Sequence, residues 1–136
     1  MKICFVGDIH TDISGSVGRI LDESALPIVE LHTTEENTGV PASVKTFAEN
    51  NNLKIVIWSP NWNDLTAPKA EIRKRSGTNI QYNKRAGVNR NEAMVVGCDA
   101  FIMVWDYESG GCADLLRRIE AHNKPVYQVK IPKKTD

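Results

Sequence analysis

The stretch "DAFIMVWDYESGGCADLLRRIEAHNKPVYQVKI" (residues 99–131) decides the fold of this chain. Its predicted elements are a strand at 99–105, a helix at 110–123 and a strand at 125–131. The strands are nearly continuous in apolar residues, and Leu115, Leu116 and Ile119 fall on one face of the helix between them. Two apolar strands separated by a helix are typical of a parallel sheet that is covered on both faces.

The rest of the chain repeats this alternation. The further predicted strands are 3–6, 27–31 and 53–58, and the further predicted helices carry Val17, Ile20 and Leu21, residues 39–50, and residues 89–98. The last of these helices has Asn89 or Asn91 as its predicted N-cap and Gly97 near its C-terminus. The sequence therefore predicts one domain over residues 1–136, an α/β Rossmann-like three-layer sandwich with a five-stranded, mainly parallel sheet.

Composition excludes several classes of protein. Seventeen basic and seventeen acidic residues cancel, which argues against a protein that coats nucleic acid or an anionic membrane. The apolar run from Ile3 to Val6 is too short for a signal peptide or a membrane span. Cys4, Cys98 and Cys112 are odd in number and lack CxxC spacing, so we expect free thiols, no metal site, no cofactor and a cytoplasmic location.

The segment 59–87 interrupts the alternation. It has no sustained period, and we expect a long basic loop in which "APKAEIRKR" (67–75) could form a short helix. Seven cations lie between Lys69 and Arg90, against Glu71 alone among acidic residues. Such a run usually forms a solvated surface. This run leads directly to a helix start, and an anion site is therefore about as strongly favoured as a solvated surface.

Parallel sheets bind ligands outside the carboxyl ends of their strands, and this rule selects four loops. These are 7–12, 32–39, 59–62 and 106–111. Gly-Gly at 110–111 opens a helix, where free N–H groups and the helix dipole favour an anion. Neither GxGxxG nor GxxxxGK[ST] is present, so the dinucleotide fingerprint and the P-loop are both excluded.

Arg90 is the strongest single candidate, because a guanidinium can bind a phosphate through two hydrogen bonds. Asn91 suits a ribose hydroxyl or a base edge, and Asp8 and Asp12 suit ribose hydroxyls or a divalent cation. The predicted ligand-binding residues are Gly7, Asp8, His10, Thr11, Asp12, Arg85, Gly87, Arg90, Asn91, Ser109, Gly110, Gly111 and Cys112.

Four side chains carry alternative roles. Cys112, at a predicted helix N-terminus, has the position of a thiol with a lowered pKa, and His10 or His32 would be its base in a nucleophilic pair. Trp62 either stacks on a base or fixes its own loop. We assign no catalytic residue from the sequence.

"AGVNRNEAM" (86–94), the Gly-Gly turn and the final "KPV" (124–126) resemble motifs of the SLOG superfamily, in particular its small YspA-like branch, which is related to DprA and LOG. The resemblance covers nearly the whole chain. Cys112 stands where that family has a threonine, and "HTTEENTG" (32–39) replaces its glycine-rich loop.

The resemblance implies a pocket for a nucleotide or nucleotide-derived signal, cyclic or NAD-derived forms included, in a sensor or a sequestering protein. It also implies a context of phage or mobile-element defence and a homo-oligomer, dimer or tetramer, with Tyr82, Trp105 and Tyr107 exposed for an interface. LOG-type relatives cleave an N-glycosidic bond with a glutamate that follows the turn, and here Leu115 or Leu116 takes that position.

Two other functions stay open beside that of a nucleotide-binding sensor or sequestering protein. An N-glycosidase or transferase would use Asp8, Asp12 or Asp114 as general acid–base. A nucleic-acid binder would use the basic tract, but zero net charge and the lack of interleaved aromatic residues argue against it.

Overall fold

A computed structural model describes residues 1–63, 65, 70–74, 76–78 and 80–132 of the chain. Its strands are β1 (Lys2–Gly7), β2 (Glu30–Thr34), β3 (Ile55–Trp58), β4 (Ile72–Lys74), β5 (Gln81–Asn83), β6 (Ala100–Trp105) and β7 (Val126–Lys130). Its helices are α1 (Val17–Ser24), α2 (Gly39–Asn50), α3 (Ala86–Gly97) and α4 (Gly110–Ala121).

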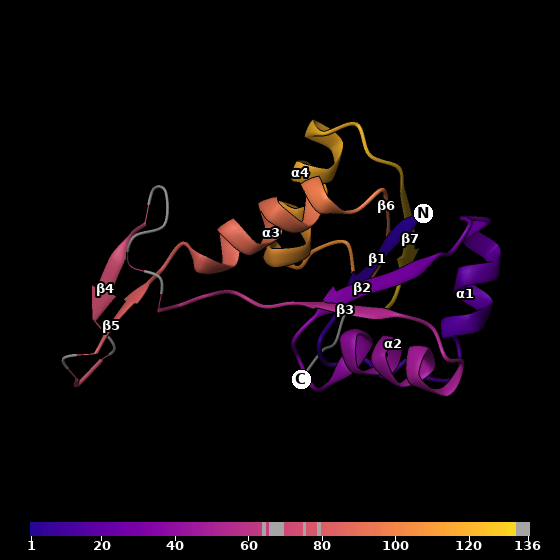
Figure 1. Cartoon of the computed structure of the whole chain (residues 1–136), viewed down its shortest axis with the longest axis horizontal. Helices are drawn as coiled ribbons and strands as arrows, with labels where there is room; N and C mark the ends of the chain where they lie inside the picture. The colour runs from indigo at the N-terminus through magenta and orange to yellow at the C-terminus, as the bar shows by residue number, and fades with distance from the viewer. Residues whose placement is uncertain (64, 66–69, 75, 79, 133–136) are drawn as a thin grey trace.

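Five strands form one parallel sheet in the order β3-β2-β1-β6-β7. The chain moves outward from β1 to β3 and then crosses back to β6, so the strand order reverses between β1 and β6. Helices α1 and α2 cover one face of the sheet, and α3 and α4 cover the other (Figure 1). The predicted α/β Rossmann-like sandwich is confirmed.

Alternate residues of β1 supply the two halves of the core. Ile3 and Phe5 pack with α1 and α2, whereas Cys4 and Val6 pack with α3 and α4. This is the period of two expected of a strand buried on both faces. The predicted helix face of Val17, Ile20 and Leu21 is buried, and Cys4 and Cys98 are buried free thiols, as predicted.

The predicted strand at 27–31 was wrong in its position, because β2 covers Glu30–Thr34. Val29 is 69% exposed, whereas the polar Thr33 and His32 are almost fully buried. Burial is possible because the Thr33 hydroxyl donates to the Phe5 carbonyl at 2.7 Å and His32 has hydrogen-bond partners on both ring nitrogens. The hydrogen-bond partners of Thr33 and His32 lie on other strands or two residues away in the chain. The apolar run at 27–31 therefore gave no sign of a buried polar strand.

The predicted start of the helix at 89–98 was also wrong. Helix α3 begins at Ala86, so Asn89 and Asn91 lie inside it and neither is its N-cap. Directly before the helix, Asn83 Oδ1 accepts a hydrogen bond from the Arg85 N–H at 3.0 Å. Gly97 is the last residue of the helix, as predicted.

The segment 59–87 contains a β-hairpin where a structureless loop was expected. Strands β4 and β5 pair antiparallel, with Arg73 opposite Tyr82, and Gly77 adopts a φ of +74° in the described part of their connection. Residues 72–74 of the predicted short helix 67–75 are therefore strand, and its residues 67–69 and 75 lie outside the described residues. Strands of three residues are too short to show a period in the sequence.

Among the described residues, no helix is both long and apolar enough to cross a membrane.

Candidate functional site

A pocket of about 490 Å³ lies at the carboxyl ends of β1, β2 and β6, where the strand order reverses. This is the position at which open parallel sheets bind their ligands. Helix α3 forms one wall and the N-terminal turns of α4 form another. The lining residues are Val6, Gly7, Asp8, Ile9, His10, Thr34, Glu36, Arg90, Asn91, Asp106, Ser109, Gly111, Cys112 and Leu115.

The pocket brings together eight of the predicted ligand-binding residues, namely Gly7, Asp8, His10, Arg90, Asn91, Ser109, Gly111 and Cys112. The remaining five do not line it: Thr11, Asp12, Arg85, Gly87 and Gly110. Three of the four loops selected from the sequence, 7–12, 32–39 and 106–111, therefore contribute to the pocket, and the loop 59–62 does not.

The loop after β1 is held by backbone contacts on two sides. The Asp8 N–H donates to the Val104 carbonyl at 2.9 Å, and the Val40 N–H of α2 donates to the Asp8 carbonyl at 2.8 Å. A Cβ on Gly7 would lie 2.0 Å from the Val104 oxygen, and one on Gly39 would lie 2.3 Å from the Ile9 carbonyl carbon. Gly7 therefore permits a close approach between β1 and β6 at the point where it also lines the pocket.

Arg90 is already paired inside the protein. Its Nη1 lies 2.8 Å from the Glu35 carboxylate, and its Nε donates to the Asn91 Oδ1 at 2.9 Å. Only 14% of the Arg90 side chain is exposed. Because Arg90 is the fifth residue of α3, the helix N-terminus does not add its positive partial charge at this side chain, which corrects the sequence-based argument.

The N-terminal turn of α4 is open toward the pocket. Asp106 Oδ1 accepts hydrogen bonds from the N–H groups of Glu108 and Ser109, both at 2.9 Å, and so fixes the approach to the helix. No atom lies within 4 Å of a Cβ placed on Gly110 or Gly111. Tyr107 adopts a φ of +67°, a left-handed conformation that is uncommon for a residue with a side chain. The free N–H groups of this turn are suited to an anionic group.

Cys112 is not an activated thiol. Burial, together with the negative charges of Asp8, Asp106 and Glu36, raises its pKa to about 11. The expectation of a lowered pKa was wrong because burial outweighs the hydrogen bond with Ser109, which lowers this pKa. Cys112 and His10 both line the pocket, but a protonated thiol is a poor nucleophile.

The lining is acidic overall. Three carboxylates, from Asp8, Glu36 and Asp106, face one guanidinium, so the formal charge of the lining is −2 with His10 neutral. One oxygen of Glu36, Oε2, is buried and has no hydrogen-bond partner among the described residues. A carboxylate oxygen that is buried without a donor is costly unless a ligand supplies one.

Sequence analysis did not name as ligand-binding six residues that line the pocket: Val6, Ile9, Thr34, Glu36, Asp106 and Leu115. Asp106 directly follows a strand, and Glu36 lies in a loop that the strand-end rule had selected, so position alone would have found both. Leu115 had been considered only for the glutamate it replaces.

Several candidates serve the fold outside the pocket. Asp12 accepts hydrogen bonds from the Ser14 N–H at 2.9 Å and the Ser43 hydroxyl at 3.0 Å, and the Ser14 contact holds its pKa below the ordinary value. Trp62 makes an edge contact with Tyr82 at the base of the hairpin. Trp105, expected on the surface, is only 4% exposed, and its indole N–H donates to Gln128.

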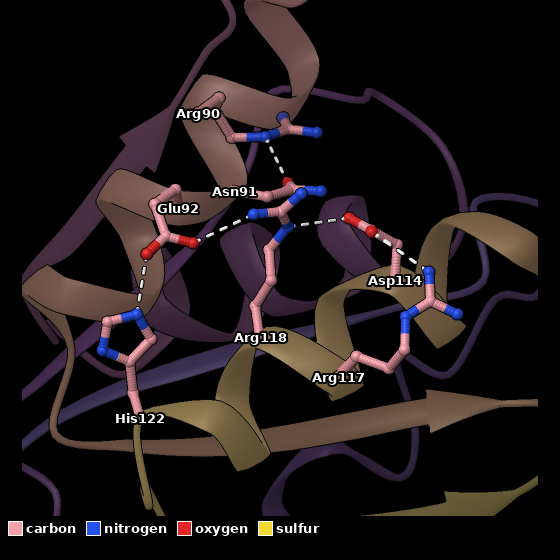
Figure 2. Close-up of polar contacts among 7 residues, drawn as sticks. All are labelled: Arg90, Asn91, Glu92, Asp114, Arg117, Arg118 and His122. Atoms are coloured by element: carbon pink, nitrogen blue, oxygen red, sulfur yellow. Dashed lines mark hydrogen bonds and ion pairs between the residues drawn. The ribbon is translucent and has the colours of Figure 1, made fainter.

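A polar cluster joins the two helical walls of the pocket. It consists of Glu92 on α3 with Asp114, Arg117 and Arg118 on α4 and His122 directly after α4 (Figure 2). Arg118 donates from Nη1 to Glu92 at 3.0 Å and from Nε to Asp114 at 2.9 Å. These hydrogen bonds lower the pKa of Asp114, and those from His122 and Arg118 lower the pKa of Glu92. Asp114, considered from the sequence as an acid–base group, is thus ion-paired with Arg118 and does not line the pocket.

The part of the chain that the structure describes contains no group of three or more His, Cys, Asp or Glu side chains that could hold a metal ion.

Comparison with known proteins found no match to a family model, to a curated protein or to a solved structure. The resemblance to the SLOG superfamily stays a prediction that rests on the motifs themselves.

Proposed function

We propose that the pocket binds a nucleotide or a nucleotide-derived signal molecule and that the protein acts as a sensor or a sequestering protein for it. The observation that carries the proposal is the combination, in one pocket at the strand-order reversal, of an open helix N-terminus, a guanidinium and three carboxylates. A volume of about 490 Å³ lies within the range of small-molecule sites.

The pocket contains hydrogen-bond donors and carboxylate acceptors, which suit different parts of a nucleotide. The N–H groups at the start of α4 and the Arg90 guanidinium suit a phosphate. Asp8, Asp106 and Glu36 accept hydrogen bonds, which suits ribose hydroxyls and base amino groups. A nucleotide carries both chemistries in one molecule.

The charge of the lining favours a ligand with many donors and little negative charge. Three carboxylates repel a polyphosphate, and Arg90 is already compensated by Glu35. We therefore expect a ligand with one phosphate, or a cyclic phosphodiester with a single charge, to bind more tightly than a nucleoside triphosphate.

The proposal is tested by a thermal-shift screen of wild type and Arg90→Ala against mono-, di-, tri- and cyclic nucleotides and NAD-derived molecules. A ligand that stabilises wild type and not the variant supports the site. Arg19→Ala, on the exposed side of α1, is the matched control and should respond as wild type does. The bound molecule should then be recovered intact by mass spectrometry. A screen without any stabilising ligand contradicts the proposal.

A second candidate, an N-glycosidase, is favoured by the same pocket carboxylates. Of the residues first considered as its acid–base group, only Asp8 lines the pocket, and Asp106 joins it there. Recovery of free base and sugar phosphate, abolished in Asp8→Asn or Asp106→Asn with binding retained, would favour this enzyme over the binding module.

A further inference from the structure

The β4–β5 hairpin stands apart from the rest of the molecule. Figure 1 shows it beyond the amino end of α3, away from the five-stranded sheet and the helices that cover it. We call residues 70–85 the arm; residues 75 and 79 of it lie outside the described residues. Strands β4 and β5 contact each other extensively, and neither makes a comparably broad contact with another described element.

The base of the arm is joined to the preceding segment by a hydrogen bond from the Asn83 N–H to the Trp62 carbonyl at 2.6 Å. Within the arm, the Lys84 N–H donates to the Glu71 carbonyl at 2.8 Å, and Asn83 Oδ1 accepts from the Glu71 N–H at 3.1 Å. An isolated two-stranded hairpin is marginally stable in water, and packing against a partner would stabilise this one.

The arm also exposes apolar surface. Ile80 is 58% exposed and Ile72 is 37% exposed, and Trp62 beside the arm is 40% exposed. Exposed apolar side chains on a projecting element leave surface that a protein partner can bury.

Charge is segregated between the arm and the rest of the chain. The arm holds five of the seventeen cations and one of the seventeen acidic residues, so its formal charge is +4 and that of the remaining residues is −4. Around the pocket, by contrast, the lining carries a formal charge of −2, and Glu108 lies two residues after the lining residue Asp106. The arm of one molecule is thus complementary in charge to the pocket face of another.

We propose that two copies of this chain associate by placing the cationic arm of each on the acidic pocket face of the other. A two-fold arrangement buries Ile80 of both arms and avoids the repulsion of an arm-to-arm contact. The arm then becomes part of the rim of the partner's pocket. This association rests on charge and exposed surface, and it does not depend on the proposed nucleotide ligand.

The first test measures the mass of the full chain in solution by sedimentation velocity over a range of concentrations. We expect a concentration-dependent dimer in wild type that dissociates in Ile80→Ser and in the double variant Arg73→Glu with Lys74→Glu. Matched controls are Val29→Ser, an exposed apolar residue directly before β2, and Arg19→Glu on α1. Circular dichroism and thermal unfolding check that each variant is folded.

The second test locates the contact. Unlabelled and ¹⁵N-labelled copies are mixed, and a carbodiimide joins lysines to nearby carboxylates. We expect mixed-isotope peptides that link Lys74 or Lys84 to Asp106 or Glu108. A monomer at every concentration, a dimer that the arm variants leave intact, or arm cross-links only within one copy would overturn the proposal. So would an arm that stays free until an oligonucleotide is added, because the partner is then nucleic acid.

Discussion

Arg90 on α3 and Glu35, which directly follows β2, form an ion pair at 2.8 Å across 55 positions of the chain. The cation expected to bind a ligand phosphate is therefore held by a carboxylate of the protein itself. Any anionic group that binds Arg90 must compete with Glu35 or share the guanidinium with it.

Glu35→Gln should for this reason tighten the binding of a singly charged nucleotide identified in the thermal-shift screen. Loss of one competing negative charge is expected to favour binding by about 0.5–1 kcal/mol, a two- to fivefold decrease in Kd. Isothermal titration calorimetry measures this directly. Glu49→Gln, an exposed glutamate on α2, is the control, and weaker binding in Glu35→Gln would show that Glu35 contacts the ligand instead.

Glu92→Gln should lower the free energy of unfolding at neutral pH and should change it less at acid pH. The pKa of Glu92 is lowered in the folded state, so its contribution is fully present above its ordinary pKa and is lost as pH falls through the lower, folded-state pKa. Because 43% of its side chain is exposed, the loss at neutral pH should stay below about 1 kcal/mol.

Thermal unfolding of wild type and Glu92→Gln at a series of pH values measures this effect. The two midpoints should converge below the ordinary pKa of a glutamate, and Glu120→Gln, exposed on α4, should follow wild type throughout. A difference that is the same at every pH would mean that Glu92 acts through packing and not through its charge.

Gly39→Ala should destabilise the protein and disturb the pocket. Gly39 has a φ of +65°, and an added Cβ would lie 2.5 Å from the Asp8 carbonyl oxygen. We expect a loss of about 1–3 kcal/mol in the free energy of unfolding. Chemical denaturation measures it, with Gly15→Ala as control because nothing lies within 4 Å of that position. Equal stability of the two variants would contradict the close contact.

Cys112 should react slowly with iodoacetamide at neutral pH. Its pKa is raised to about 11, chiefly by burial, so little thiolate is present there. The rate of alkylation at Cys112, followed by peptide mass spectrometry, should climb only at strongly alkaline pH. Asp8→Asn should increase the rate at a given pH, because it removes a negative charge that raises this pKa. Rapid labelling at neutral pH would restore the thiol as a candidate nucleophile.

Much of the candidate site was predictable, because strand ends in a parallel sheet converge whatever their separation in the sequence. Asp8, His10 and Ser109 were found in this way and do line one pocket, which they share with Arg90, a residue chosen for its guanidinium. The acidic character of that pocket was not predictable from the same loops. It depends on Glu36 and Asp106 pointing inward and on Asp12 pointing elsewhere, which is decided by hydrogen bonds such as that from Ser43 to Asp12.

The sequence by itself determined the order of strands and helices of the sheet. Apolar runs and helical spacing are local properties, and they specified β1, α2 and the β6-α4-β7 unit closely. Only the tertiary structure decided where β2 lies, how the arm folds and which charge Arg90 meets. A buried polar strand, a hairpin of three-residue strands and an ion pair across 55 positions all depend on partners distant in the chain. Such pairings leave no local pattern, because the free energy that selects them is gained only when the segments meet in the folded protein.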